Sequence, residues 1–435
     1  MEQTVGIQVL IIGGGATGTA IARDLALRGV SVVLVERKDL NAGASGGNHG
    51  LLHSGARYVC SDPETAIECN TEIDVIKRTA SHCVEETGGL FVAVQGDDEQ
   101  YIADFSKMCE KSGIPFRAVD VNDARLMEPA LSEKIIAAYA VNDASINLFK
   151  LCIENMKDVA SRGNRYFSNC TLESFDMTRH QINHAKVICK STHEMFNIRA
   201  DIYVNAAGAW AGQVASLTGA VTNMVFSKGT LLVTSQRMTK RVINRLRKSN
   251  DGDILVPGGV VSILGTTSVR LDSPDHIYPT VDEVDLIINE GASMVPSLKT
   301  CRYIRAYSGV RPLVSTGGTD GRDVSRGFTL IDHNQDDVNN FITITGGKLS
   351  TYRLMAEKAS DMVCQKLGVN RKCQTKDIPL PSTRSGEWSE PTVFTKDLRS
   401  STGHDPVLCE CEMVPASACG YNSRCHQKGR QQAGS

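Results

Sequence analysis

The chain opens with an apolar run, a glycine turn and a helical pattern. Residues 5–12 are mostly apolar without regular alternation, which is typical of a buried parallel strand. Residues 16–28 carry apolar side chains at helical spacing and stop at Gly29, a residue type that often ends helices. Residues 30–36 form a second apolar run. This order of strand, glycine turn, helix and strand predicts the first half of a dinucleotide-binding βαβ unit.

Later segments also predict strands, turns and helices. The sequence contains no internal repeat. Residues 200–210 predict another buried strand that runs into a glycine turn. Residues 327–345 predict strand and turn, and Gly346-Gly347-Lys348 then precedes a helix over 349–367. Helices are also predicted over 63–82 and 281–293, strands over 225–270, and a mixture of short strands and helices over 88–150.

Composition and charge narrow the class of protein. The 435 residues are 41% hydrophobic and 22% charged, which excludes a disordered or fibrous protein and fits two to three globular domains. The formal net charge of -2 gives no basic field for nucleic acid. No apolar run is long enough to span a bilayer, and no basic segment precedes the first apolar run. We therefore expect a cytoplasmic protein whose membrane contact, if any, is peripheral or made through a partner.

The glycine turn fits the spacing of a phosphate-binding motif. Gly13, Gly15 and Gly18 match G-x-G-x-x-G: the first makes the turn, the second admits a pyrophosphate and the third lets helix and strand pack closely. Glu36 ends the next strand, where a carboxylate can accept a hydrogen bond from a ribose hydroxyl. An acid there disfavours a 2′-phosphate, so the motif predicts FAD or NAD. No second mononucleotide half follows directly; a Gly/Ser/Asn/His loop over 41–58 intervenes, which favours a discontinuous FAD-binding domain.

Six segments, taken in order, resemble one family. They are GASGGNHGLLHSGARY (43–58), VNAAGAWA (204–211), GTTS (265–268), YSGVRPL (307–313), VSRGFTLIDH (324–333) and ITGGKLSTYRLMAE (344–357). Together they resemble FAD-dependent glycerol-3-phosphate dehydrogenases, and a following Cys-x-Cys makes the large subunit of the anaerobic, quinone-linked form the closer match. The resemblance covers about residues 5–380.

The resemblance implies an α/β fold in which a Rossmann-like FAD-binding domain carries an inserted α+β substrate domain, as in D-amino-acid oxidase and glycine oxidase. The implied domains are FAD-binding 1–88, 149–222 and 324–368, substrate 89–148 and 223–323, and a C-terminal extension 369–435. The implied FAD-binding residues are Gly13, Gly14, Gly15, Ala16, Thr17, Gly18, Glu36, Arg37, Ser45, Asn48, Ala207, Gly208, Gly346, Gly347, Lys348 and Leu349.

The implied substrate is glycerol 3-phosphate, a triol monophosphate with a charge near -2. Its site needs cations, and Arg57, Arg311, Arg326 and Lys348 occupy the family's basic positions. Tyr58 is expected to orient the substrate or stack on the flavin. Lys348 and the helix that starts near Leu349 are also placed to stabilise negative charge on the reduced ring. Each arginine is alternatively a surface or interdomain ion pair.

A secondary alcohol needs a base when hydride leaves its carbon, and histidine has a suitable pKa. We place His53 ahead of His333 for this role, so the predicted catalytic residues are His53, Arg311 and Lys348. The implied reaction transfers hydride to the flavin, releases dihydroxyacetone phosphate and passes electrons to a quinone, directly or through a membrane-anchoring or iron–sulfur partner subunit. The alternatives are an amino-acid or 2-hydroxy-acid oxidase or dehydrogenase, and a non-catalytic flavoprotein subunit.

The 14 cysteines give little support for a metal site. Most stand singly in helical or strand patterns, so we expect reduced thiols. Cys409 and Cys411 match the Cys-x-Cys that opens the family's tail domain, but Cys419 and Cys425 do not follow at the family's spacing. We therefore expect no intact cluster, with Cys409 and Cys411 as vestigial ligands at most, and a C-terminal region altered by truncation or a shifted reading frame.

Overall fold

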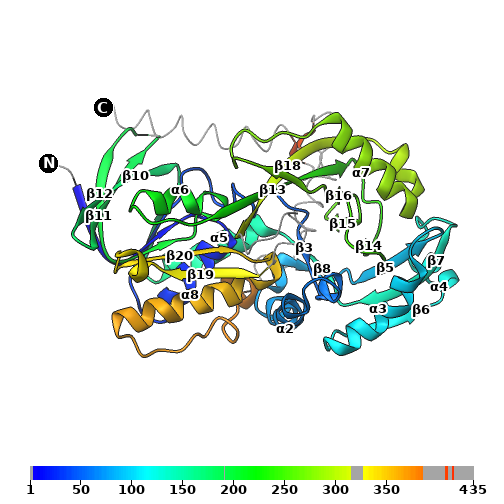
Figure 1. Cartoon of the computed structure of the whole chain (residues 1–435), viewed down its shortest axis with the longest axis horizontal. Helices are drawn as coiled ribbons and strands as arrows, with labels where there is room; N and C mark the ends of the chain where they lie inside the picture. Colours follow the sequence, from blue (N-terminus) through cyan, green and yellow to red (C-terminus); the bar gives the residue numbers. More distant parts are fainter. Residues whose placement is uncertain (1–2, 191, 315–326, 386–406, 410–413, 416–435) are drawn as a thin grey trace.

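The computed structural model describes residues 3–190, 192–314, 327–385, 407–409 and 414–415. Two large sheets lie next to each other, with helices packed on both (Figure 1). In the view of Figure 1, the first sheet lies on the left above helix α8, and the second lies on the right beside helices α7, α3 and α4. This arrangement confirms the predicted α/β class with an inserted α+β part.

The first sheet is built around the predicted βαβ unit. Its central strand β1 pairs in parallel with β2 on one side and with β12 on the other. β12 also pairs in parallel with β20, which joins chain segments far apart in sequence. The strands of this sheet are β1 (Gln3–Ile12), β2 (Val32–Val35), β9 (Arg165–Phe167), β10 (Cys170–Thr178), β11 (Gln181–Cys189), β12 (Met195–Asn205), β19 (Phe328–Asp332) and β20 (Phe341–Gly346).

Three helices cover one face of this sheet. α1 packs against both α5 and α8, and their apolar faces share one core with the central strands. α1 ends at Leu27 with Arg28 as its C-cap, and Gly29 follows with a positive φ of 76°, so the predicted helix stop is confirmed. The three helices are α1 (Ala16–Leu27), α5 (Leu148–Ser161) and α8 (Tyr352–Leu367).

The second sheet is mainly antiparallel, and its long strand β18 reaches the first sheet. β13 pairs with β18 over most of its length, and β18 also contacts β20 of the first sheet. The strands of the second sheet are β5 (Gly89–Val94), β6 (Phe116–Val119), β7 (Ile135–Val141), β13 (Met224–Thr234), β14 (Val242–Arg245), β15 (Ile254–Gly258), β16 (Val261–Gly265), β17 (Val269–Leu271) and β18 (Tyr303–Val314).

Helices and a small sheet complete the second part. α7 begins with a capping box in which Thr280 and Glu283 bond reciprocally, and it packs on β13 and β16. A three-stranded sheet joins β3 (Leu51–Leu52), β4 (Val84–Glu85) and β8 (Ala144–Ile146). The remaining α-helices are α2 (Pro63–Thr79), α3 (Glu99–Lys111), α4 (Val121–Met127), α6 (Ala211–Ser216), α7 (Val281–Met294) and α9 (Pro381–Ser385). The domain boundaries given above stay a prediction.

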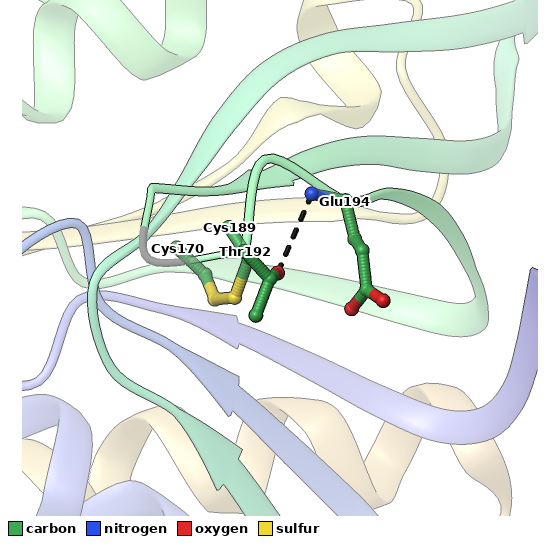
Figure 2. Close-up of a disulfide and its surroundings, with 4 residues drawn as sticks. All are labelled: Cys170, Cys189, Thr192 and Glu194. Carbon is green, nitrogen blue, oxygen red and sulfur yellow. Dashed lines mark hydrogen bonds between the residues drawn. A yellow bond between two sulfur atoms is a disulfide. The ribbon is translucent and has the colours of Figure 1, made fainter.

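One expectation about the cysteines is wrong. Cys170 and Cys189 form a disulfide, although we expected reduced thiols (Figure 2). The cause is the pairing of β10 with β11, which places the two residues directly opposite each other across a hairpin. Eight other described cysteines are free.

The predicted C-terminal cysteine site falls largely outside the described residues. Cys409 lies in the short strand β21 (Val407–Cys409), which pairs with β22 (Val414–Pro415). Cys411, Cys419 and Cys425 lie outside the described residues. Within the described ranges, no group of three histidine, cysteine or acidic side chains is placed to hold a metal ion. In the same ranges, no helix is both long and apolar enough to cross a membrane.

Candidate active site

A cavity of about 590 Å³ lies where the two large sheets meet. Its wall combines the glycine turn after β1, the loop over 42–49, the turn after β12, the middle of β13, the last part of β18, and the segment after β20. Segments from all parts of the sequence therefore share one site. The wall includes most of the residues predicted to bind cofactor and substrate.

The glycine turn forms a cradle that side chains would fill. A Cβ on Gly13 would lie 2.5 Å from the Ala206 carbonyl oxygen, and one on Gly18 would lie 2.0 Å from the Gly13 carbonyl oxygen. Gly15 begins the first turn of α1, whose amides and dipole favour an anion. This backbone fits the pyrophosphate of a dinucleotide.

Neighbouring polar side chains hold the cradle in shape. Glu36 accepts hydrogen bonds from the backbone N–H of Gly14 (2.7 Å) and of Lys38 (2.8 Å). The Ser45 hydroxyl accepts from the Ala16 N–H at 3.0 Å, so it already occupies one amide of the first helical turn. Direct contacts of Glu36 and Ser45 with FAD stay a prediction.

Two other predicted cofactor residues make contacts within the protein. The Asn48 amide nitrogen donates to the Ala44 and Ser45 carbonyl oxygens, and its Oδ1 accepts from the Gly50 N–H. Asn48 therefore shapes its own loop. The guanidinium of Arg37 lies 4.0 Å from the centre of the Trp210 ring, and both line the cavity.

The segment after β20 places a glycine pair and a lysine at the cavity. Gly346 and Gly347 both have positive φ, at 84° and 73°, so glycine is favoured at each. Lys348 follows, with its Nζ 5.0 Å from the centre of the Tyr58 ring. Ala207, Gly208 and Leu349 line the same cavity. The predicted cofactor and substrate residues of this region are therefore brought together.

Arg311 reaches the cavity from β18. It lies opposite Ser227 of β13, and its guanidinium donates to the Ser227 hydroxyl (3.3 Å) and the Thr267 carbonyl oxygen (3.1 Å), and also to the Thr266 hydroxyl. A Cβ on Gly229 would lie 2.6 Å from Arg311 Nη2, so a glycine there leaves space for the guanidinium. These three hydrogen bonds go to neutral oxygens and orient the guanidinium.

Arg57 has a different setting, which sequence reasoning missed. The side chain lines the cavity, but its Nη2 lies 2.6 Å from the buried Asp253 carboxylate, and its Nη1 donates to the Arg245 carbonyl oxygen. Arg247 also pairs with Asp253, at 2.8 Å. The alternative interpretation of Arg57 as part of an ion pair is therefore correct in part, and Asp253 offsets its charge. Arg326, the fourth predicted cation, lies outside the described residues.

Replacing Asp253 with asparagine tests how the fold depends on this ion pair. Removing one charge of a buried pair leaves its partner uncompensated, which costs about 3–5 kcal/mol. We expect the free energy of unfolding of D253N, measured in urea, to fall by about this amount. The exposed Asp272 is the matched control, and D272N should stay within about 0.5 kcal/mol of the wild type. An unchanged D253N would show that Asp253 does not stabilise Arg57.

The two predicted base candidates lie in different surroundings. His53 lines the cavity, with its ring edge-on to Tyr58 at 5.1 Å between centres, and its backbone N–H donates to the Ser350 hydroxyl. His333 is fully buried between Asp336 (2.6 Å) and Thr343 (2.8 Å), and its ring stacks on Phe341. Both nitrogens of His333 are thus occupied away from the cavity wall, which gives it a structural role.

A buried carboxylate holds the turn that carries His53. Asp143 accepts two hydrogen bonds of 2.7 Å from Ser54, through its backbone N–H and its hydroxyl, and a third from the Asn244 amide. Burial raises the pKa of Asp143, and these donors oppose the shift. The turn is therefore anchored on the link between β7 and β8, and through it on Asn244 of β14.

His49 is a cavity residue that the sequence analysis did not single out. It stands in the loop over 42–49, and its ring lies 6.2 Å from that of His53. Its position four residues before His53 was the available signal, because both histidines stand in one glycine-rich segment.

This combination of a βαβ phosphate cradle, a long cavity between two sheets and a glycine-lysine turn defines a flavin-dependent oxidoreductase with an inserted substrate domain. The comparisons agree: the model of the family described as "FAD dependent oxidoreductase" matches residues 8–353, and the chain belongs to that family. FAD is its cofactor.

Within the family, the chain is similar to proteins named as components of anaerobic glycerol-3-phosphate dehydrogenases. It is 43% identical to one such subunit from Escherichia coli K12, over 95% of this chain and 80% of that protein. It is 40% identical to another from Haloferax volcanii, over 93% and 75% of the two chains.

Solved structures share the fold. A glycerol-3-phosphate dehydrogenase from Bacillus halodurans, complexed with FAD, has a TM-score of 0.68 at 23% identity and covers 91% of this chain and 71% of its own. Glycine oxidase from Geobacillus kaustophilus has a TM-score of 0.67 at 19% identity, with coverage of 86% and 98%. The predicted likeness to glycine oxidase in fold is confirmed.

Proposed function

We propose that this chain oxidises sn-glycerol 3-phosphate to dihydroxyacetone phosphate. The observation that carries the proposal is the 43% identity to a component of an anaerobic glycerol-3-phosphate dehydrogenase over 95% of the chain. The cavity supports it, because Arg311 and Lys348 face the same space from opposite segments of the chain. A phosphate monoester carries close to two negative charges at neutral pH, and this wall offers it cations and fixed donors.

Different residues around the cavity would bind FAD, bind the substrate phosphate and accept the substrate proton. The glycine turn and the first turn of α1 would hold the pyrophosphate of FAD, and Gly346-Gly347 would lie near its ring. FAD supplies the two-electron acceptor for the hydride that leaves the substrate carbon. Arg311 would grip the phosphate, Lys348 would balance negative charge, and His53 would accept the hydroxyl proton.

We also propose which kind of protein accepts the electrons of this chain and where in the cell the chain works. The similar proteins from Escherichia coli and Haemophilus influenzae are named as subunits, so we infer that this chain passes its electrons to a partner protein and then to a quinone. Such a partner would hold the protein at the cytoplasmic face of the membrane.

A substrate panel tests the proposal against the amino-acid and 2-hydroxy-acid alternatives. The FAD-loaded protein is mixed with glycerol 3-phosphate, glycine, L-proline and 2-hydroxyglutarate, and reduction of an artificial dye is followed. We expect turnover with glycerol 3-phosphate and little with the others. Turnover confined to a carboxylate substrate would support the runner-up, and an FAD-bound protein inactive with all four would support a non-catalytic role.

Arg311 gives a sharper test of the phosphate assignment. Charge-assisted hydrogen bonds contribute about 1.5–3 kcal/mol each, so R311Q should lower the affinity for glycerol 3-phosphate about ten- to a hundredfold. The apparent affinity comes from initial rates of dye reduction. Arg305 lies on the same strand with an exposed side chain, and R305Q is the matched control that should behave like the wild type. Equal losses in both variants would contradict the assignment.

A further inference from the structure

One ring nitrogen of His49 is held in the cavity wall without the hydrogen bond that a buried imidazole nitrogen usually has. This Nδ1 is buried and has no hydrogen-bond partner among the described residues. Buried polar atoms are nearly always paired, so an unpaired one needs an explanation such as a ligand or an ordered water. The ring borders the same cavity as Arg311 and His53, which makes a cavity ligand the natural partner.

Three cations from separate elements line the same cavity as this imidazole. Arg311 comes from β18, Arg57 from the turn after β3, and Lys348 from the segment after β20. Burial and the positive charges of Arg311, Arg57 and Lys348 lower the pKa of His49 to about 3. His49 is therefore neutral at physiological pH until something offsets the surrounding charge. His53 is a second titratable ring, 6.2 Å from that of His49 between centres, and the Tyr307 hydroxyl donates a hydrogen bond to the carbonyl oxygen of the preceding residue, Asn48.

A phosphate monoester would change this balance. Its two negative charges, placed beside Arg311, would offset the positive field that keeps His49 neutral. The imidazole then gains both a compensating charge and a hydrogen-bond acceptor for its second N–H. Binding of the anion and protonation of the ring therefore favour each other.

On this basis, and resting on the proposed function, we propose that His49 is a further substrate-binding residue that takes up a proton from solvent when the phosphate group binds and donates an N–H to a phosphate oxygen. The structure separates this role from that of His53. His53 packs on Tyr58, and Tyr58 lies against Lys348 beside the glycine pair. His49 instead follows Asn48, whose carbonyl oxygen accepts a hydrogen bond from Tyr307 of β18, the strand that carries Arg311. His49 thus belongs to the phosphate end of the cavity and His53 to the alcohol end.

Proton uptake can be measured directly by calorimetry. Dihydroxyacetone phosphate is titrated into the oxidised, FAD-loaded protein at pH 7.5, in two phosphate-free buffers with different heats of ionisation. The ligand is the product of the proposed reaction and has no secondary alcohol left to give hydride to the flavin. At this pH it is mostly dianionic because its second pKa is about 6. We expect uptake approaching one proton per site in the wild type. H49Q should take up almost none and bind about ten- to a hundredfold more weakly.

Two comparisons make the result specific to His49. H53Q, changed at the neighbouring ring, should keep the uptake of the wild type, and the FAD content of each variant shows whether the cradle is intact. The proposal is overturned by a wild type that binds the ligand without proton uptake, or by H49Q with undiminished uptake. If H49Q does not fold, nitrogen-15 NMR of the histidines in the wild type and in H53Q decides: a ring that H53Q retains must change from neutral to protonated on adding the ligand, and a change confined to the His53 ring would overturn the proposal.

Failure of this inference is distinguishable from failure of the proposed function. A wild type that is reduced by glycerol 3-phosphate but shows no proton uptake would remove only the role of His49. A wild type that neither binds dihydroxyacetone phosphate nor is reduced by glycerol 3-phosphate would remove both.

Discussion

Replacing Gly18 with alanine is expected to yield a protein without bound FAD. The new Cβ would lie 2.0 Å from the Gly13 carbonyl oxygen and 3.1 Å from its carbon, both backbone atoms. Helix α1 or the Gly13 turn must therefore move, and with it the amides that would hold the pyrophosphate. Alanine otherwise stabilises a helix interior by about 1 kcal/mol over glycine, so helix propensity cannot explain a loss. The ratio of flavin to protein absorbance in the purified variant measures the effect.

Gly6 provides the matched control for this change. It lies in β1, the strand that leads into the same turn, and a Cβ there would meet nothing within 4 Å. G6A should keep the FAD content of the wild type. If G18A keeps a full complement of FAD, the close contact between helix and turn is not what forms the cofactor site.

Replacing His53 with glutamine is expected to slow reduction of the flavin by glycerol 3-phosphate about 10²- to 10⁴-fold, the usual contribution of a general base. The ring lines the cavity beside Tyr58, and Ser350 and the Asp143 contacts hold its backbone in place. Glutamine keeps polarity and similar length but cannot accept the proton. Rapid mixing without oxygen measures the rate of the reductive step separately from electron transfer to an acceptor.

The reductive rate of H53Q can be compared with that of a variant at a histidine outside the cavity. H180Q, changed at an exposed histidine outside the cavity wall, should match the wild type. FAD content and substrate affinity of H53Q should change little, because neither the phosphate cradle nor Arg311 is altered. A reductive rate within a few fold of the wild type would exclude His53 as the base.

The first βαβ unit could be predicted from sequence because its determinants are local. A largely apolar strand, glycines at fixed spacing and a helix followed by the stop signal Gly29 lie within one short segment. The predicted helices over 63–82, 281–293 and 349–367 were also confirmed, with small shifts at their ends, for the same reason. The resemblance supplied the order of the remaining motifs.

Contacts between distant segments could not be predicted in this way. Nothing near Arg57 in the sequence indicates that Asp253 would meet it, because the pair depends on how the fold brings the turn after β3 to the residue that precedes β15. The disulfide required the register of β10 and β11, which hydrophobic pattern alone leaves open. His49 stood in a quoted motif, but its charged surroundings arise from three elements that meet only in the fold.

Reduction of the bound FAD by glycerol 3-phosphate can be observed directly in the protein's absorption spectrum. The purified FAD-loaded protein is kept free of oxygen, and its visible absorption spectrum is recorded before and after one equivalent of glycerol 3-phosphate. We expect the yellow absorbance of oxidised flavin to be lost and dihydroxyacetone phosphate to appear in an amount equal to the reduced flavin. A flavin spectrum that glycerol 3-phosphate leaves unchanged, in a protein that retains its FAD, would contradict the account.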